Sequence, residues 1–259
     1  MVNIPKFWTW AHIRLEKFDY LTKWENNERI RKLVRNILFT DWGDDMSKQP
    51  LCLFWNRISS CEIQLKLVDL SQVRLSNVDS RIIAKSFVKI EQLDLHYPWE
   101  NDFYLCDIQL TPIFTEIIET NDLKLKKLCL TCNDVSEVSP EILSSAVVKL
   151  EEFEYRNGGM SMSISENQLH SILFKIANIK EEDLKLRKLD IVFPHSYLDS
   201  VQLDVLKTVF LKIDWILGYY SLPKNVMRDM VLTIRNDEEH SYKLQKNIGH
   251  IQVEDLYLL

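Results

Sequence analysis

Residues 125–155 read LKKLCLTCNDVSEVSPEILSSAVVKLEEFEY, and this stretch decides how the rest of the chain is interpreted. Its first eleven residues fit the pattern LxxLxLxxNxL, with apolar residues at the spaced positions and Asn133 at the asparagine position. Residues 65–95 repeat the stretch without a gap, and nine of the 31 aligned positions are identical, whereas unrelated segments would share roughly two. A fixed period of this kind indicates similar units stacked in a row.

Segments typical of strands and of helices alternate on both sides of this stretch. Strands are predicted to begin at residues 34, 65, 90, 125, 150 and 186, so that long and short steps alternate. A short strand is predicted at residues 11–15 and a weaker one at 211–217. Helix starts are indicated by Thr111-Pro112 and Ser139-Pro140, where proline follows a capping residue, and by the capping box of Ser165 and Gln168. A further helix is predicted at residues 224–234.

The motif and the alternating units resemble the leucine-rich repeat of the ribonuclease-inhibitor type. The match is specific at residues 125–135 and looser elsewhere, because Val73 stands at the asparagine position and Pro194 interrupts the same region of a later unit. The resemblance implies an α/β fold, a leucine-rich-repeat solenoid with a curved parallel β-sheet inside and helices outside. We expect this domain, with a C-terminal cap, to span residues 31–259.

Residues 1–30 are expected to form an N-terminal cap, which their tryptophans would help to seal. This segment is similar to the tail of an F-box, a motif that precedes leucine-rich repeats in some animal proteins. The similarity implies substrate recognition in a cullin-type ubiquitin ligase. The F-box helices that dock on the ligase adaptor are not in the sequence, so we expect adaptor binding only if a complete F-box lies upstream of Met1. The residues that carry the similarity are Pro5, Phe7, Trp8, Trp10, Ile13 and Leu15.

Composition excludes several classes of partner. The net charge is -6, which argues against nucleic acid as a partner, because binding to phosphates needs a basic surface. No apolar run approaches the roughly 18 residues of a membrane span, and no secretory signal is recognisable at the N-terminus. Five cysteines are few and odd in number, which favours a reducing compartment. We therefore expect a cytoplasmic protein, with the nucleus as a second possibility.

No catalytic or metal-binding motif stands out. Cys129 and Cys132 have the spacing of metal ligands, but the sequence has no second pair to complete a site. The six histidines are scattered, and neither a nucleophile motif nor a phosphate-binding loop is present. We expect no enzymatic activity, no metal and no cofactor.

An acidic row is predicted on one face of the sheet. Side chains alternate along a strand, so the residue between the last two leucines of LxxLxL points away from the core. Four of these five residues are carboxylates, and aligned like charges are mildly destabilising. The row is therefore either a binding strip for a basic segment of a protein partner or a set of polar residues that keeps the face soluble. Its members are Asp69, Asp94, Glu154 and Asp190, with Cys129 as the uncharged exception.

The loop at residues 96–107 carries aromatic side chains, among them Tyr97 and Trp99. Aromatic residues at an edge often anchor partner proteins, but these could equally fold back over the neighbouring unit. The sequence thus predicts a non-catalytic protein–protein interaction module, with Tyr97 and Trp99 beside the acidic row. The alternative is a scaffold or a stoichiometric inhibitor protein that acts independently of an F-box.

Overall fold

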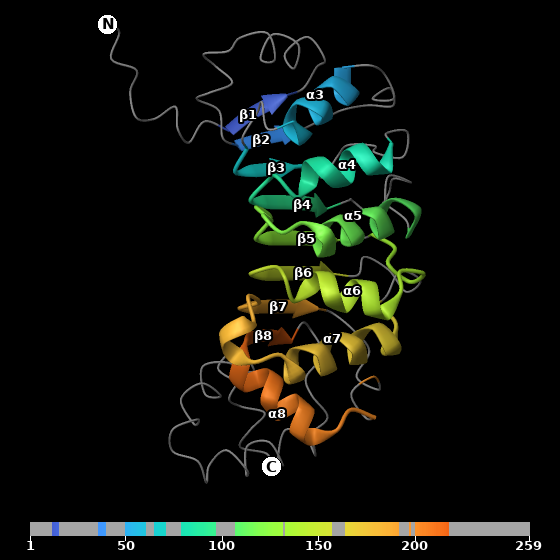
Figure 1. Cartoon of the computed structure of the whole chain (residues 1–259), viewed down its shortest axis with the longest axis vertical. Helices are drawn as coiled ribbons and strands as arrows, with labels where there is room; N and C mark the ends of the chain where they lie inside the picture. Colours follow the sequence, from blue (N-terminus) through green and yellow to red (C-terminus); the bar gives the residue numbers. More distant parts are fainter. Residues whose placement is uncertain are drawn as a thin grey trace, which may run out of the picture.

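The computed structural model describes residues 12–15, 36–39, 50–60, 65–70, 79–96, 107–131, 133–156, 164–191, 197 and 200–217. These residues form an α/β fold in which helices lie along one side of a single sheet (Figure 1). The sheet has eight strands within the described residues, in the order of the sequence, and every neighbouring pair is parallel. Apart from residues 12–15, the predicted tryptophan-rich cap falls outside the described ranges, as does the predicted helix at 224–234.

Among the described residues, each strand from β2 to β7 is followed by one α-helix, and we call such a strand with its helix a unit. The strands are β1 His12–Leu15, β2 Asn36–Phe39, β3 Leu67–Asp69, β4 Gln92–His96, β5 Lys127–Thr131, β6 Glu152–Arg156, β7 Lys188–Ile191 and β8 Asp214–Leu217. The helices are α3 Pro50–Ser59, α4 Ser80–Phe87, α5 Asp107–Glu119, α6 Pro140–Val147, α7 Glu166–Asn178 and α8 Leu203–Lys212. A 3₁₀ turn, η2, spans Glu181–Asp183.

The core lies between the sheet and the helices. Strand positions such as Val68, Leu93 and Leu128 are at most 1% exposed, and they pack with the apolar faces of the helices into one cluster. Burying one such side chain contributes about 1.5–3 kcal/mol. Because neither a strand nor a helix here can bury its apolar face alone, stacking of the units is what creates the core.

The predicted spacing of the strands is confirmed. Strands β2 to β7 each begin two residues after the predicted start, so the alternation of long and short steps is preserved. For β3 to β7 the reason for the offset is that the first apolar residue of each motif packs in the core before regular pairing begins, as Leu125 does at 2% exposure. The strand predicted at 11–15 also forms, and it joins the sheet as the parallel neighbour of β2. The sheet thus reaches into the segment expected to be a separate cap.

The prediction that a helix opens at Thr111-Pro112 is wrong. Helix α5 begins at Asp107 and contains Pro112, although a proline inside a helix removes a hydrogen bond and costs about 3 kcal/mol. Leu110, in the turn before the proline, is completely buried in the core. We infer that burial of this extra turn offsets the cost of the proline.

The segments that are similar in sequence also have similar geometry. Helices α4 and α6 have eight residues each, whereas α5 and α7 have thirteen. After both short helices, Val88 and Val148 donate to the carbonyl four residues back at 3.3 Å. Lys89 and Lys149 donate to the carbonyl three residues back at 3.1 Å. The equivalence predicted from identical residues therefore extends to backbone hydrogen bonds.

Buried polar side chains connect β4, β5 and β6. Asn133 is completely buried, and its Nδ2 donates to the carbonyls of Leu95 at 2.7 Å and Thr131 at 3.1 Å. The Tyr155 hydroxyl in turn donates to the Asn133 carbonyl at 3.0 Å. These bonds explain why an asparagine follows the strand: its amide satisfies carbonyls where the ladder ends.

Other side chains make comparable bonds between successive units. Gln168 in α7 donates through Nε2 to the carbonyls of Val135 and Val138, both at 2.6 Å. Lys212 in α8 donates to the carbonyls of Ile176, at 3.2 Å, and Ala177, at 2.7 Å, near the end of α7. Other donors to the preceding unit are Lys149 to the carbonyl of Ile118 and Ser86 to that of Trp55.

Candidate functional site

The acidic row predicted from sequence lies in direct register across five strands. The pairing runs from Asp69 to Asp94, Cys129, Glu154 and Asp190 on strands β3 to β7. Their neighbours along each strand point into the core, so the row occupies the opposite face of the sheet. We call this face the open face, because no helix of the described residues lies over it (Figure 1).

The members of the row differ in their accessibility. Asp69, Asp94 and Glu154 are half-buried, whereas Asp190 is only 2% exposed. Asp190 was predicted as a partner-binding residue on an exposed face, and its burial removes it from the accessible surface. Each of the four carboxylates also interacts with other groups of the chain. A protein bound at the row would therefore add to these interactions or replace them. The accessible members of the row are therefore Asp69, Asp94 and Glu154.

Cys129 separates the carboxylates of Asp94 and Glu154. It is a free cysteine, 7% exposed, and its Sγ lies 3.7 Å from the Thr131 hydroxyl. Burial, followed by the negative charges of Asp94 and Glu154, raises the pKa of the Cys129 thiol to about 12. The thiol is therefore protonated at neutral pH, and it is a poor nucleophile because the thiolate is the reactive form.

The charged residues at the starts of the same strands alternate in sign, unlike the carboxylates of the acidic row. One residue before the paired strand segments, the chain places charges of alternating sign on consecutive strands. Two cross-strand ion pairs join Lys126 to Glu151 at 3.8 Å and Lys127 to Glu152 at 3.3 Å. Opposite charges across strands are mutually favourable, whereas like charges are not. We call this set the edge row, and its members are Lys66, Glu91, Lys126, Glu151 and Arg187.

The aromatic residues predicted to flank the row, Tyr97 and Trp99, lie outside the described residues, as does Cys132. Within the described residues, no group of three potential metal ligands converges. In the same part of the chain, no helix combines the length and the apolar character needed to cross a bilayer.

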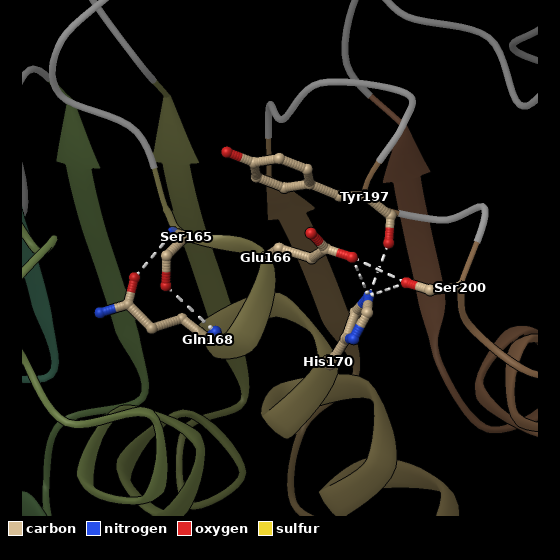
Figure 2. A network of polar contacts seen from close by, with 6 residues as sticks. All are labelled: Ser165, Glu166, Gln168, His170, Tyr197 and Ser200. Carbon is tan, nitrogen blue, oxygen red and sulfur yellow. Dashed lines mark hydrogen bonds and ion pairs between the residues drawn. The ribbon is translucent and has the colours of Figure 1, made fainter.

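A second polar cluster, which sequence reasoning missed, lies at the start of α7 (Figure 2). The Ser200 hydroxyl donates to Glu166 Oε1 at 2.7 Å and lies 3.3 Å from His170 Nε2. His170 Nε2 is also 2.6 Å from the carbonyl oxygen of Tyr197 and 3.8 Å from Glu166 Oε1. Glu166 and His170 have the i, i+4 spacing of a helical pair, but Ser200 is thirty residues away, so the sequence offered no signal for the third member.

The geometry of this cluster differs from that of a catalytic triad. In a triad the serine and the carboxylate contact different nitrogens of the imidazole, whereas here Ser200, Glu166 and the Tyr197 carbonyl all contact Nε2. A carbonyl only accepts, so the 2.6 Å contact requires a proton on Nε2, which then cannot take a proton from Ser200. The cluster fastens residues 197 and 200 to α7. The adjacent capping box of Ser165 and Gln168, with bonds of 3.3 and 2.8 Å, confirms the predicted helix start.

No known protein family matches the chain in sequence, and no curated protein matches it. The functional argument therefore depends on the motif, the fold and the open face.

Proposed function

We propose that the chain is a leucine-rich-repeat protein of the ribonuclease-inhibitor type, and that it binds another protein through its open face without catalysing a reaction. The motif at residues 125–135, the alternating unit lengths and the sequential parallel sheet support the first part. Asn133 supports it further, because it bonds to a carbonyl of the preceding strand where the pattern places an asparagine. In a curved sheet of this kind the open face is the concave side.

The alignment of like charges in the acidic row carries the second part. The edge row, three residues earlier along the chain, alternates in sign, and its Lys126 and Glu151 form an ion pair across strands. A row kept soluble by polar residues alone could alternate in the same way at lower electrostatic cost. The acidic row instead keeps Asp69, Asp94 and Glu154 at one sign, which suits a basic segment of a partner protein.

The role that we favour is substrate recognition in a cullin-type ubiquitin ligase, in the cytoplasm or the nucleus. It is suggested by the similarity of residues 5–15 to an F-box tail, and it requires a complete F-box upstream of Met1. The second candidate is a scaffold or stoichiometric inhibitor that uses the same face without ubiquitin transfer.

A charge-neutralising triple variant tests the proposal. Asp69→Asn, Asp94→Asn and Glu154→Gln keep the side-chain shapes and remove three negative charges from the open face. The matched control, Asp122→Asn, Glu181→Gln and Glu182→Gln, removes three charges from exposed positions elsewhere. In affinity purification from cells, quantified by mass spectrometry, the first variant loses partners that the control retains. Identical partner sets for both variants refute binding by the row.

The ligase role has a separate readout. Co-purification of the cullin adaptor with the full-length gene product, and turnover of a bound partner that depends on ubiquitin, support it. Stoichiometric partner binding without the adaptor favours the scaffold or inhibitor.

A further inference from the structure

The spacing of the open-face row restricts the conformation of a bound basic segment. Neighbouring strands lie about 4.8 Å apart, so row positions in direct register recur at about that interval. An α-helix advances about 5.4 Å per turn, and an extended chain advances about 6.6 Å between side chains on one side. Over the three intervals from Asp69 to Glu154, a helix drifts out of step by about 2 Å and an extended chain by about 5 Å. The extended chain is thus displaced by a whole strand.

The dimensions of the sheet also suit a helix. Strands β4, β5 and β6 have five residues each and are therefore about 16 Å long. A helix of about 10–12 Å diameter that crosses these strands at right angles fits within that length. No described helix competes for this face.

Asn36 provides an independent indication that the face accepts hydrogen-bond donors. It lies on β2 and pairs in register with Leu67 on β3, whereas Leu38 pairs with Asp69, so its side chain shares the open face but lies two residues before the level of the row. The side chain is 9% exposed, and Oδ1 has no hydrogen-bond donor in the part of the chain described. A buried acceptor of this kind normally has a donor. Lysine and arginine carry donors and no acceptors, so a basic side chain at the β2 end of the bound segment suits Asn36, as the other basic side chains suit the carboxylates.

We propose that the segment bound by the open face is an α-helix lying across β3 to β6, with basic side chains on successive turns. This inference rests on the proposed function. Lysine or arginine faces Asp69, Asp94 and Glu154. An uncharged side chain faces Cys129, whose protonated thiol offers no negative charge to pair with. In sequence terms, the partner carries basic residues at positions 1, 5 and 12 of a helix and an uncharged residue at position 8.

Three synthetic peptides of identical composition test the conformation. The first has lysines at positions 1, 5 and 12, the second has them at positions 1, 3 and 7 to suit an extended chain, and the third is scrambled. Fluorescence anisotropy at low and physiological salt measures binding to the wild-type chain and to the triple variant of Asp69, Asp94 and Glu154. We expect the first peptide to bind at least tenfold more tightly than the others. We also expect its helical circular dichroism to increase on binding and its affinity to fall in the variant.

Replacement of Cys129 tests which position of the peptide faces which strand of the sheet. A fourth lysine at position 8 should give little gain with the wild type, and about a tenfold gain with Cys129→Asp, once urea unfolding shows that this variant is folded. Should Cys129→Asp unfold, the reciprocal change is Asp94→Asn, which abolishes the benefit of the lysine at position 5 alone.

The outcomes separate the two proposals. Equal binding of all three peptides, lost in the triple variant, overturns the helix and leaves the basic partner in place. Tighter binding of the second peptide assigns an extended partner. Binding that is the same in the triple variant and the wild type overturns both.

Discussion

The buried thiol of Cys129 predicts a loss of stability at alkaline pH. The ordinary pKa of the group is 9.0, and in the folded chain it is raised to about 12. Between these values the folded state keeps a proton that the unfolded state has released, so the free energy of unfolding falls as pH rises. The contribution is fully present below pH 9 and is lost towards pH 12. The slope approaches about 1.4 kcal/mol per pH unit, which gives about 2 kcal/mol between pH 9 and 11.

Urea unfolding at pH 8, 9, 10 and 11 measures this effect in the wild type and in Cys129→Ser. Serine does not titrate in this range, and the lysines and tyrosines common to both proteins cancel in the difference. We expect the wild type to lose about 2 kcal/mol more than the variant between pH 9 and 11. A difference between the two proteins that does not change with pH refutes the burial and charge assigned to this thiol.

Three substitutions test the side-chain hydrogen bonds between units. Asn133→Ala leaves the Leu95 and Thr131 carbonyls without their side-chain donor and should lower the free energy of unfolding by about 2–4 kcal/mol, whereas Asn121→Ala on the exposed surface should change it by less than about 0.5. Gln168→Met removes the donor to two buried carbonyls, and we expect a loss of about 2–4 kcal/mol by the same urea titration. Lys212→Met, compared by thermal unfolding with Lys180→Met at an exposed position, should lower the midpoint by several degrees while the control does not. If Asn133→Ala were no more destabilising than Asn121→Ala, or Lys212→Met no more than Lys180→Met, the stabilising role assigned to that donor would be contradicted.

Much of the fold could be predicted from the sequence, because the signals are local and repeated. The spacing of Leu125, Leu128 and Leu130 indicates one buried strand face. The equivalent apolar residues sixty residues earlier indicate a second strand with the same buried face. The start of α7 was equally predictable, because Ser165 and Gln168 satisfy each other within four residues. The start of α5 was not, since the cost of Pro112 is local while the burial of Leu110 depends on the neighbouring units.

The candidate site divides in the same way. The alignment of Asp69, Asp94 and Glu154 follows from strand periodicity, and the register of the sheet confirms that they lie in one row, with Cys129 between Asp94 and Glu154. The burial of Asp190 depends on its tertiary surroundings, which the repeated spacing of the sequence does not predict. Likewise, the meeting of Ser200 and His170 depends on how two units pack, and neither residue belongs to the repeated pattern.

The side-chain donors between units described above have a common direction, and this bears on synthesis of the chain. Asn133, Tyr155, Gln168 and Lys212 each donate to a carbonyl of the unit before their own. A nascent chain emerges from the ribosome N-terminus first, so each unit exposes unsatisfied carbonyls until its successor arrives. Folding during translation therefore lags one unit behind emergence, and a ribosome stalled before Gln168 holds a last unit that is still open to chaperones and proteases.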